Sequence, residues 1–197
     1  MSNRERILQH VRENQPPAVE LPSLDFSAVQ YDDPRAQFIE MLTAVGGQAV
    51  EVASLAAAHD HLMQMSVYVE ATRMCVLVDG VGEGNVVLAD FDNPHDLADV
   101  DLTVLQAEFG VAENGAVWLD DSSLTHRALP FLTRHLVIVL AANQIVHNMH
   151  QAYERIEFTE PRFGVFVSGP SKTADIEKSL VIGAHGARSL TVYLVDA

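Results

Sequence analysis

Apolar runs of strand length alternate along the chain with longer segments whose apolar residues recur at helical spacing. The apolar runs lie at 49–52, 73–78, 102–105, 135–141 and 190–195. Runs of this length, bounded by polar or glycine residues, are typical of buried strands. The spacing at 34–45 and 54–65 indicates helices. Because a strand, helix, strand order is typical of parallel sheets, the pattern predicts an α/β fold.

The helix predicted at 34–45 has clear start and stop signals. Asp33 stands where a capping residue is expected, and Pro34 stands at the first helical position. Gly46 and Gly47 follow the last apolar residue and are expected to end the helix. The apolar stripe that would face the core consists of Phe38, Met41, Leu42 and Val45.

Later segments continue the alternation. Further strands are predicted at 86–89, 116–119 and 163–167, and helices at 106–109, 143–157 and 173–180. No linker or repeat divides residues 31–197, so we expect a single three-layer α/β domain with a mostly parallel sheet. Ligands would then bind near the carboxyl ends of the strands. Residues 1–30 are predicted to form a peripheral helix at 3–12 and a tether that contains prolines.

The charge balance argues against one class of partner. Twelve basic residues stand against 27 acidic residues, for a net charge of −15. Phosphate backbones are bound by clustered Lys and Arg, so we expect no nucleic-acid partner.

The longest apolar runs, such as 136–142, are far shorter than the roughly 20 residues that a membrane helix needs. We expect a cytoplasmic protein without a membrane span or signal segment, and leave a homo-oligomer open.

Cysteine occurs once, at Cys75, inside an apolar run. An iron–sulfur cluster normally needs about four cysteine ligands, so a single thiol cannot hold one. Burial in a strand is the expected role of Cys75. We therefore predict that this chain carries no cofactor and that any iron–sulfur cluster of its pathway sits on a partner protein.

Two other patterns have ordinary explanations. His147 and His150 share a face of a predicted helix, but no third ligand is evident, so we predict no metal site. A glycine-rich loop follows the strand at 73–78, but its spacing is not that of a dinucleotide-binding loop, and a predicted strand follows it rather than a helix. Its glycines are Gly80, Gly82 and Gly84.

Two polar turns near the C-terminal end offer the most functional groups. The first, at 168–173, follows an apolar run and precedes the predicted helix at 173–180. Its hydroxyls, its ammonium and the unpaired N–H groups of a helix start could bind an anion, although an ordinary capped proline turn would have the same pattern. The second, at 183–186, places His185 between two glycines. The ligand-binding candidates of the first turn are Ser168, Gly169, Ser171, Lys172 and Thr173.

The sequence SGPSKTADIE at 168–177, followed by GAHG at 183–186, resembles the signature of the lactate utilization protein C family, also called the LUD domain family. The segment AEFGVAENG at 107–115 is similar to the middle motif of that family. The resemblance covers roughly residues 102–195. It implies the α/β fold shared with sugar-phosphate isomerases and coenzyme A transferases, and a role in oxidising L-lactate together with iron–sulfur partner proteins.

Three side chains are candidate reacting groups. His185 could donate or accept a proton, Asp175 could orient a ligand hydroxyl or the His185 ring, and Glu113 could act as base or nucleophile. Each also has a purely structural interpretation, as a turn or cap residue. We expect their turns to form one rim that binds a small carboxylate or acyl ligand. Further ligand-binding candidates are Asn114, Glu177, Gly183 and Gly186.

Three functional hypotheses follow. The first is an accessory or ligand-binding subunit of an L-lactate utilization system that acts with iron–sulfur partners. The second is an autonomous enzyme acting on a sugar phosphate or an acyl-coenzyme A, which would require a reacting carboxylate such as Glu113. The third is a small-ligand sensor without chemistry. Turnover by the isolated chain would favour the second, whereas tight ligand binding without turnover would favour the third.

Overall fold

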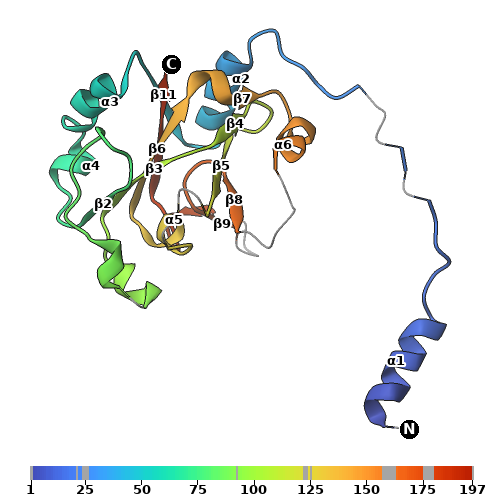
Figure 1. Cartoon of the computed structure of the whole chain (residues 1–197). Coiled ribbons are helices and arrows are strands. Elements are labelled where there is room, and N and C mark those ends of the chain that lie inside the picture. Colours follow the sequence, from blue (N-terminus) through green and yellow to red (C-terminus); the bar gives the residue numbers. More distant parts are fainter. Residues whose placement is uncertain are drawn as a thin grey trace.

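A five-stranded parallel sheet forms the centre of the molecule (Figure 1). The computed structural model describes residues 2–20, 22–23, 27–91, 93–121, 124, 126–156, 163–174 and 180–196. The strand order is β1-β11-β6-β3-β2. The bounds are Gln48–Val52 for β1, Met74–Val76 for β2, Leu102–Gln106 for β3, His135–Ala141 for β6 and Ser189–Val195 for β11. The α/β class and the mostly parallel sheet are confirmed.

One face of this sheet is covered by α3 (Leu55–Leu62) and α4 (Ser66–Val69). Side chains alternate between the two faces of a strand. Val137 and Val139 of β6 therefore share a face, and with Tyr193 of β11 they pack in one buried cluster with Leu62 of α3. The periodicity of the sequence located these strands because both of their faces are buried.

The other face is covered mainly by a second sheet rather than by a helical layer. Its strand order is β7-β4-β5-β8, in which β5 is antiparallel to both β4 and β8, and β7 is parallel to β4. The bounds are Phe109–Val111 for β4, Ala116–Asp120 for β5, Ile145–Val146 for β7 and Gly164–Val167 for β8. Ile138 of β6, Val117 of β5 and Phe38 of α2 (Pro34–Ala44) belong to one buried cluster. The α3–α4 layer, the parallel sheet and this further layer agree with the predicted three-layer domain, but the sequence did not predict that the third layer is mainly a sheet.

Shorter elements complete the described part of the chain. α6 (Met149–Arg155) covers the far side of the second sheet, where Ala152 packs against Phe109 and Val111. α5 (Leu129–Leu132) precedes β6, and β9 (Lys172–Ala174) pairs with β10 (Leu180–Ile182) in an antiparallel hairpin. Three 3₁₀ turns cover η1 (Leu88–Asp90), η2 (Pro94–Leu97) and η3 (Ala142–Gln144).

The helix α2 forms as its sequence signals predict. The side chain of Asp33 accepts a hydrogen bond from the N–H of Ala36, and Pro34 is the first helical residue. The helix ends at Ala44 with Val45 as its C-terminal cap, and Gly46 follows with a φ of 85°. Start and stop signals of this kind are local, which is why the sequence alone located the helix.

Four predicted segments are wrong, because contacts distant in sequence override local pattern. At 106–109 the chain extends instead of forming a helix: the N–H of Ala107 bonds Val139 in the parallel sheet, and that of Glu108 bonds Trp118 in the second sheet. At 86–89, the N–H of Val86 donates to the carbonyl of Met74, and a 3₁₀ turn follows instead of a strand. The predicted helix at 143–157 is confined to α6, since η3 and β7 occupy its first part.

The predicted helix at 173–180 is contradicted at both ends. Thr173 pairs with Val181 in the β9–β10 hairpin. Thr and Val are β-branched and favour extended backbone, which the acidic helix-like residues between them concealed. Residues 175–179, including Asp175 and Glu177, lie outside the described part of the structure.

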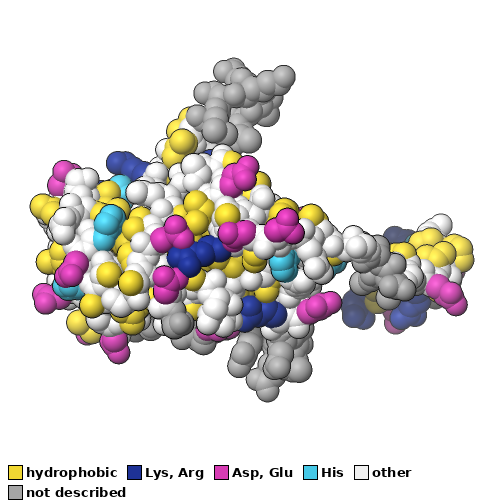
Figure 2. Space-filling model, turned by 90° about the horizontal axis from the view of Figure 1, so that it is seen from above, with side chains coloured by type: hydrophobic (Ala, Val, Ile, Leu, Met, Phe, Trp, Pro, Cys, Tyr) yellow, Lys and Arg dark blue, Asp and Glu magenta, His cyan; other side chains and the backbone are white. Residues whose placement is uncertain are grey.

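The N-terminal helix stands apart from the α/β body at the end of an extended tether (Figure 1). α1 (Asn3–Glu13) begins with a capping box, in which Ser2 and Glu5 bond each other's backbone. None of its residues is buried. Figure 2 shows basic groups on this helix and mainly acidic groups across the face of the body seen from above. Among the described helices, none has the length and apolar character needed to cross a bilayer.

Candidate functional site

The two polar turns near the C-terminal end lie side by side. The N–H of Ser171 donates to the carbonyl of Ala187 at 2.8 Å, and the N–H of Gly183 donates to the carbonyl of Ser171 at 2.9 Å. Gly186 is also close, because a Cβ at that position would lie 2.9 Å from the Cβ of Ser171. Backbone contacts therefore hold the 168–173 turn directly against the 183–186 turn.

The third predicted turn joins this pair through Ser168. Its hydroxyl donates to the backbone carbonyl of Asn114 at 2.8 Å. The Asn114 side-chain oxygen accepts a hydrogen bond from the N–H of Ala116 at 3.1 Å, so the amide stabilises the turn before β5. The three turns form one cluster of neighbouring loops, which we call the turn cluster (residues 113–115, 168–173 and 183–186).

Glu113 has a structural role in this arrangement. Its carboxylate accepts a hydrogen bond from the N–H of Met149 at 2.9 Å. Met149 is the first residue of α6, where unpaired N–H groups attract negative charge. The backbone N–H of Glu113 also donates to the carbonyl of His147 at 3.1 Å. Glu113 therefore points toward the start of α6, although its side chain is exposed.

Gly169 and Lys172 fasten the turn cluster to the end of α2. Gly169 is buried with a φ of 74°, and a Cβ there would lie 2.5 Å from the carbonyl oxygen of Val45. The same carbonyl accepts a hydrogen bond from the Lys172 ammonium. A positive charge at a helix C-terminus is favourable, so Lys172 stabilises α2 as well as the turn.

We expect Lys172→Met to lower the free energy of unfolding by about 1 kcal/mol, because the Val45 carbonyl loses its charged donor. Lys172→Arg is the matched variant and should retain most of this stability, since it keeps a positive donor. Urea unfolding curves would measure both. Equal stability of Lys172→Met and the unmodified protein would show that the ammonium has no such structural role.

His185 belongs to the second turn of the cluster, at 183–186. Its side chain is exposed, and it makes no hydrogen bond with any described residue. Gly183, two residues before His185, is closely packed. Gly183 has a φ of 70°, and a Cβ there would lie 2.5 Å from the Cγ of Arg188. His185 is therefore held on a tightly packed loop while its imidazole faces solvent.

The 168–173 and 183–186 turns lie at the amino ends of the parallel strands, not at their carboxyl ends as predicted. Gly46 precedes β1, and Ala187 precedes β11. The 168–173 turn follows β8, which belongs to the second sheet and not to the parallel one. In Figure 1 the carboxyl end of β11 is at the top, and β9 lies in the lower part of the α/β body. The rule for ligands in parallel sheets therefore does not apply to this cluster.

The expected source of anion-binding N–H groups also changes. A helix start at Thr173 would leave its first N–H groups unpaired. Thr173 instead lies in the β9–β10 hairpin. Side-chain groups that a ligand could contact include the Ser171 hydroxyl, the ammonium protons of Lys172 not directed at Val45, and the His185 ring.

Among the described residues, no three His, Cys, Asp or Glu side chains lie together as a metal site requires. The Nδ1 of His147 accepts a hydrogen bond from the N–H of Tyr31 at 3.0 Å, so this imidazole anchors the end of the tether. Burial raises the pKa of the Cys75 thiol to about 11, which keeps it protonated at neutral pH.

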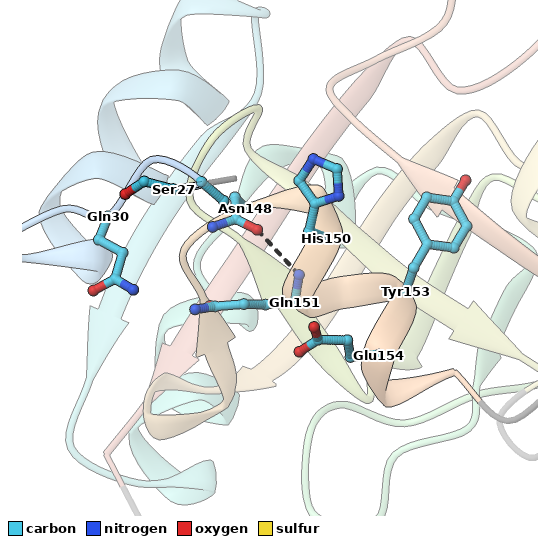
Figure 3. Close-up of a pocket in the computed structure, with 8 residues that line it drawn as sticks. Ser27, Gln30, Asn148, His150, Gln151, Tyr153 and Glu154 are labelled. Atoms are coloured by element: carbon cyan, nitrogen blue, oxygen red, sulfur yellow. Dashed lines mark hydrogen bonds between the residues drawn. The ribbon is translucent and has the colours of Figure 1, made fainter. Parts of the chain in front are cut away.

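A hollow of about 520 Å³ opens between the tether and α6 (Figure 3). Asn148 lies at its base; its side chain donates to the carbonyl of Val29 at 2.7 Å and accepts from the N–H of Gln151 at 3.0 Å. Tether and helix are distant in sequence, so no local motif could have predicted the hollow. The residues around it are Ser27, Ala28, Gln30, Asn148, His150, Gln151, Tyr153 and Glu154.

Comparison with known proteins identifies related chains. A family model described as the LUD domain matches residues 78–195, more than half of the chain. Lactate utilization protein C of Shouchella clausii is 35% identical over 106 residues, which cover 51% of this chain and 45% of that protein. Lactate utilization protein C of Oceanobacillus iheyensis is 27% identical over 135 residues, which cover 66% of this chain and 54% of that protein.

The chain spans about half the length of these curated relatives. Uncharacterized protein YkgG of Escherichia coli is 34% identical over 102 residues, 47% of this chain and 42% of that protein. The crystal structure of a DUF162 family protein from Deinococcus radiodurans has a TM-score of 0.65 at 19% identity, and the match covers 85% of this chain and 99% of that one. This last likeness shows a shared fold.

Proposed function

Because the chain belongs to the LUD domain family, we propose that it is an accessory, ligand-binding subunit of an L-lactate utilization system in the cytoplasm. Support for the pathway comes from the relatives named lactate utilization protein C. The ligand is a small carboxylate or acyl compound, bound at the turn cluster. The carrying observation is the convergence of the three turns, in which Ser168 bonds Asn114 and Ser171 bonds Ala187.

The turn cluster has suitable groups for a small hydroxylated anion. Lys172 supplies a positive charge next to Ser171, and a charged donor can strengthen a hydrogen bond to a carboxylate. His185 can donate a hydrogen bond or exchange a proton with a ligand hydroxyl because its imidazole is exposed. Asp175 and Glu177 belong to the same sequence motif and are proposed as further groups of the site. Glu113 holds the neighbouring α6 and is assigned a supporting role.

Electron transfer is proposed to take place on iron–sulfur partner proteins. The sequence contains one cysteine, Cys75, and a cluster normally needs about four cysteine ligands. Cys75 is fully buried and its thiol stays protonated at neutral pH, so it is a poor ligand for a cluster on another chain. Lactate oxidation would then require the assembled system, with this chain binding or positioning the small ligand.

We expect His185→Gln to reduce lactate-dependent growth, or lactate oxidation by the assembled system, by at least about tenfold, equivalent to about 1.4 kcal/mol. Glutamine keeps a polar side chain but cannot take up a proton. The thermal midpoint of the His185→Gln protein should stay within a few degrees of the unmodified value, because the position is exposed. His95→Gln is the matched control, since His95 is exposed and lies outside the turn cluster.

Three results would contradict the proposal. Full activity of a folded His185→Gln protein would remove His185 from the site. Turnover of an acyl-coenzyme A or a sugar phosphate by the purified chain alone would establish an autonomous enzyme instead. A stoichiometric absorbance band between roughly 300 and 500 nm in the purified chain would likewise contradict the assignment of redox chemistry to partners.

A further inference from the structure

Ser189 and His135 form a hydrogen-bonded pair at the amino ends of two central strands. The parallel register of β11 and β6 places the two residues side by side. The Ser189 hydroxyl oxygen lies 2.8 Å from the Nδ1 of His135, and both side chains are half-buried. Neither residue belongs to the motifs that form the turn cluster.

The Ser189–His135 pair lies on the face of the parallel sheet that the second sheet does not cover. Leu190 packs in the buried cluster that includes the second sheet, whereas Tyr193 packs in the cluster beneath α3 and α4. Because successive side chains of a strand alternate, Ser189 shares the face of Tyr193. A ligand at Ser189 and His135 would therefore bind at a site separate from the 168–173 turn, although the chain connects the two through residues 183–188.

Two arginines flank the pair. The N–H of Arg188 donates to the carbonyl of Arg134 at 2.7 Å, which brings the residues just before the two strands together. The Arg134 guanidinium forms an ion pair with Asp101 at 2.8 Å. The Arg188 guanidinium is exposed and has no ion pair with any described residue. Among the described residues, this guanidinium therefore has no counter-charge, in a chain of net charge −15, and its positive charge acts on the His135 ring.

Charged groups on the neighbouring elements set the protonation of His135. Burial lowers its pKa first, and the positive charges of Arg188 and Arg134 lower it further. Asp101 and Glu70, at the end of α4, act in the opposite direction without cancelling the effect. His135 is therefore neutral at pH 7, and its ring can both accept from the Ser189 hydroxyl and donate through its other nitrogen.

We propose that Arg188, Ser189 and His135 form a binding site for a small oxyanion, a carboxylate or a phosphate group. Arg188 supplies the charge and a planar set of donors that suits either group. His135 supplies a neutral donor through its Nε2–H, and the Ser189 hydroxyl, which donates to the Nδ1 of His135, holds the ring in that tautomer. An anion bound here favours the protonated imidazole, so binding and proton uptake by His135 are coupled. The proposal does not depend on the role in lactate utilization.

The test follows the His135 ring by NMR as pH is varied, first without and then with inorganic phosphate or L-lactate. Either anion, when it binds, should raise the pKa of His135, because a nearby negative charge stabilises the imidazolium. Arg188→Gln should raise the pKa of His135 in the free protein by removing a positive neighbour. It should also weaken anion binding by about ten- to a hundredfold.

Arg127→Gln is the matched control, because Arg127 is also exposed and pairs with Asp121 elsewhere in the molecule. This variant should bind the anions as the unmodified protein does. Ser189→Ala should weaken binding by less than Arg188→Gln, since it removes only the hydrogen bond that orients the His135 ring. A response to phosphate alone would identify a phosphate site, and one to L-lactate alone a carboxylate site. No response of His135 to either anion, or equal affinities of Arg188→Gln and Arg127→Gln, would overturn the proposal.

Discussion

Gly115→Ala is expected to destabilise the protein by about 3 kcal/mol, which corresponds to a thermal midpoint roughly 6–12 °C lower in a chain of this size. Gly115 has a φ of 63°, a conformation that a residue with a Cβ adopts at a cost. A Cβ at this position would also lie 2.4 Å from the backbone nitrogen of Leu42 and 2.7 Å from its Cα. Leu42 is in α2 and fully buried, so neither partner can move freely.

Gly80→Ala separates the two causes. Gly80 has a φ of 80°, but no atom lies within 4 Å of a Cβ placed there. This variant should lose only the conformational part, about 1 kcal/mol, or about 2–4 °C. Calorimetry of both variants would measure the difference. Equal thermal midpoints would show that the contact between the 113–115 turn and α2 contributes nothing to stability.

The same contact has a consequence for the turn cluster. Gly115 lies beside Asn114, whose carbonyl accepts the Ser168 hydrogen bond. A shift of this turn away from α2 would move that carbonyl relative to the 168–173 turn. Gly115→Ala should therefore weaken ligand binding at the turn cluster even at temperatures where the protein remains folded.

Asp101→Asn is the second substitution with a large expected effect, about 2 kcal/mol of stability at pH 7. One oxygen of the Asp101 carboxylate accepts bonds from the Thr72 hydroxyl at 2.7 Å, the Thr72 N–H at 2.9 Å and the Arg73 N–H at 3.0 Å. The other oxygen accepts from Arg134 at 2.8 Å. The side chain is only 14% exposed, so solvent screens these interactions weakly.

The pH dependence of this contribution follows from the pKa of Asp101. The Thr72 hydroxyl, the two N–H groups and Arg134 together lower that pKa from 3.8 to about 2, against the opposing effect of burial. A group whose pKa is lower in the folded state stabilises the protein above the unfolded value. Its contribution should therefore be complete above pH 4 to 5 and disappear as the pH falls toward about 2.

Asp99→Asn is the control for this prediction. Asp99 pairs with Arg73, but its side chain is 62% exposed, and an exposed ion pair is worth about 0.5 kcal/mol. Urea unfolding between pH 2 and pH 7 should show that the stability difference between Asp101→Asn and the unmodified protein vanishes at low pH. A difference that stays constant over this range would show that the ionised carboxylate is not its cause.

The oxyanion proposal and the Asp101 prediction involve the same edge of the sheet. Arg134 is held by Asp101, while Arg188 is not paired among the described residues. Asp101→Asn would leave Arg134 without its carboxylate and add a second uncompensated positive charge next to His135. The pKa of His135 should then fall further, which provides an independent check on the electrostatic links in this region.

The sequence by itself determined the elements whose signals are local or whose strands are buried on both faces. The capped helix α2 and the central strands β6 and β11 were predicted because caps, prolines and continuous apolar runs do not depend on distant partners. The family motifs also identified the three turns of the turn cluster. The same kind of signal could not find the Ser189–His135 pair, since only the register of two strands brings these residues together.

Tertiary structure alone decided the second sheet, the β9–β10 hairpin and the end of the sheet where the turns meet. β4 and β8 are short, and each extends because β5 lies between them and supplies hydrogen bonds on both sides. The Thr173 strand forms because Val181 pairs with it, although acidic residues between them favour a helix start. These hydrogen bonds depend on which segments pair in the fold, so local pattern predicts the groups a site contains but not where the fold places them.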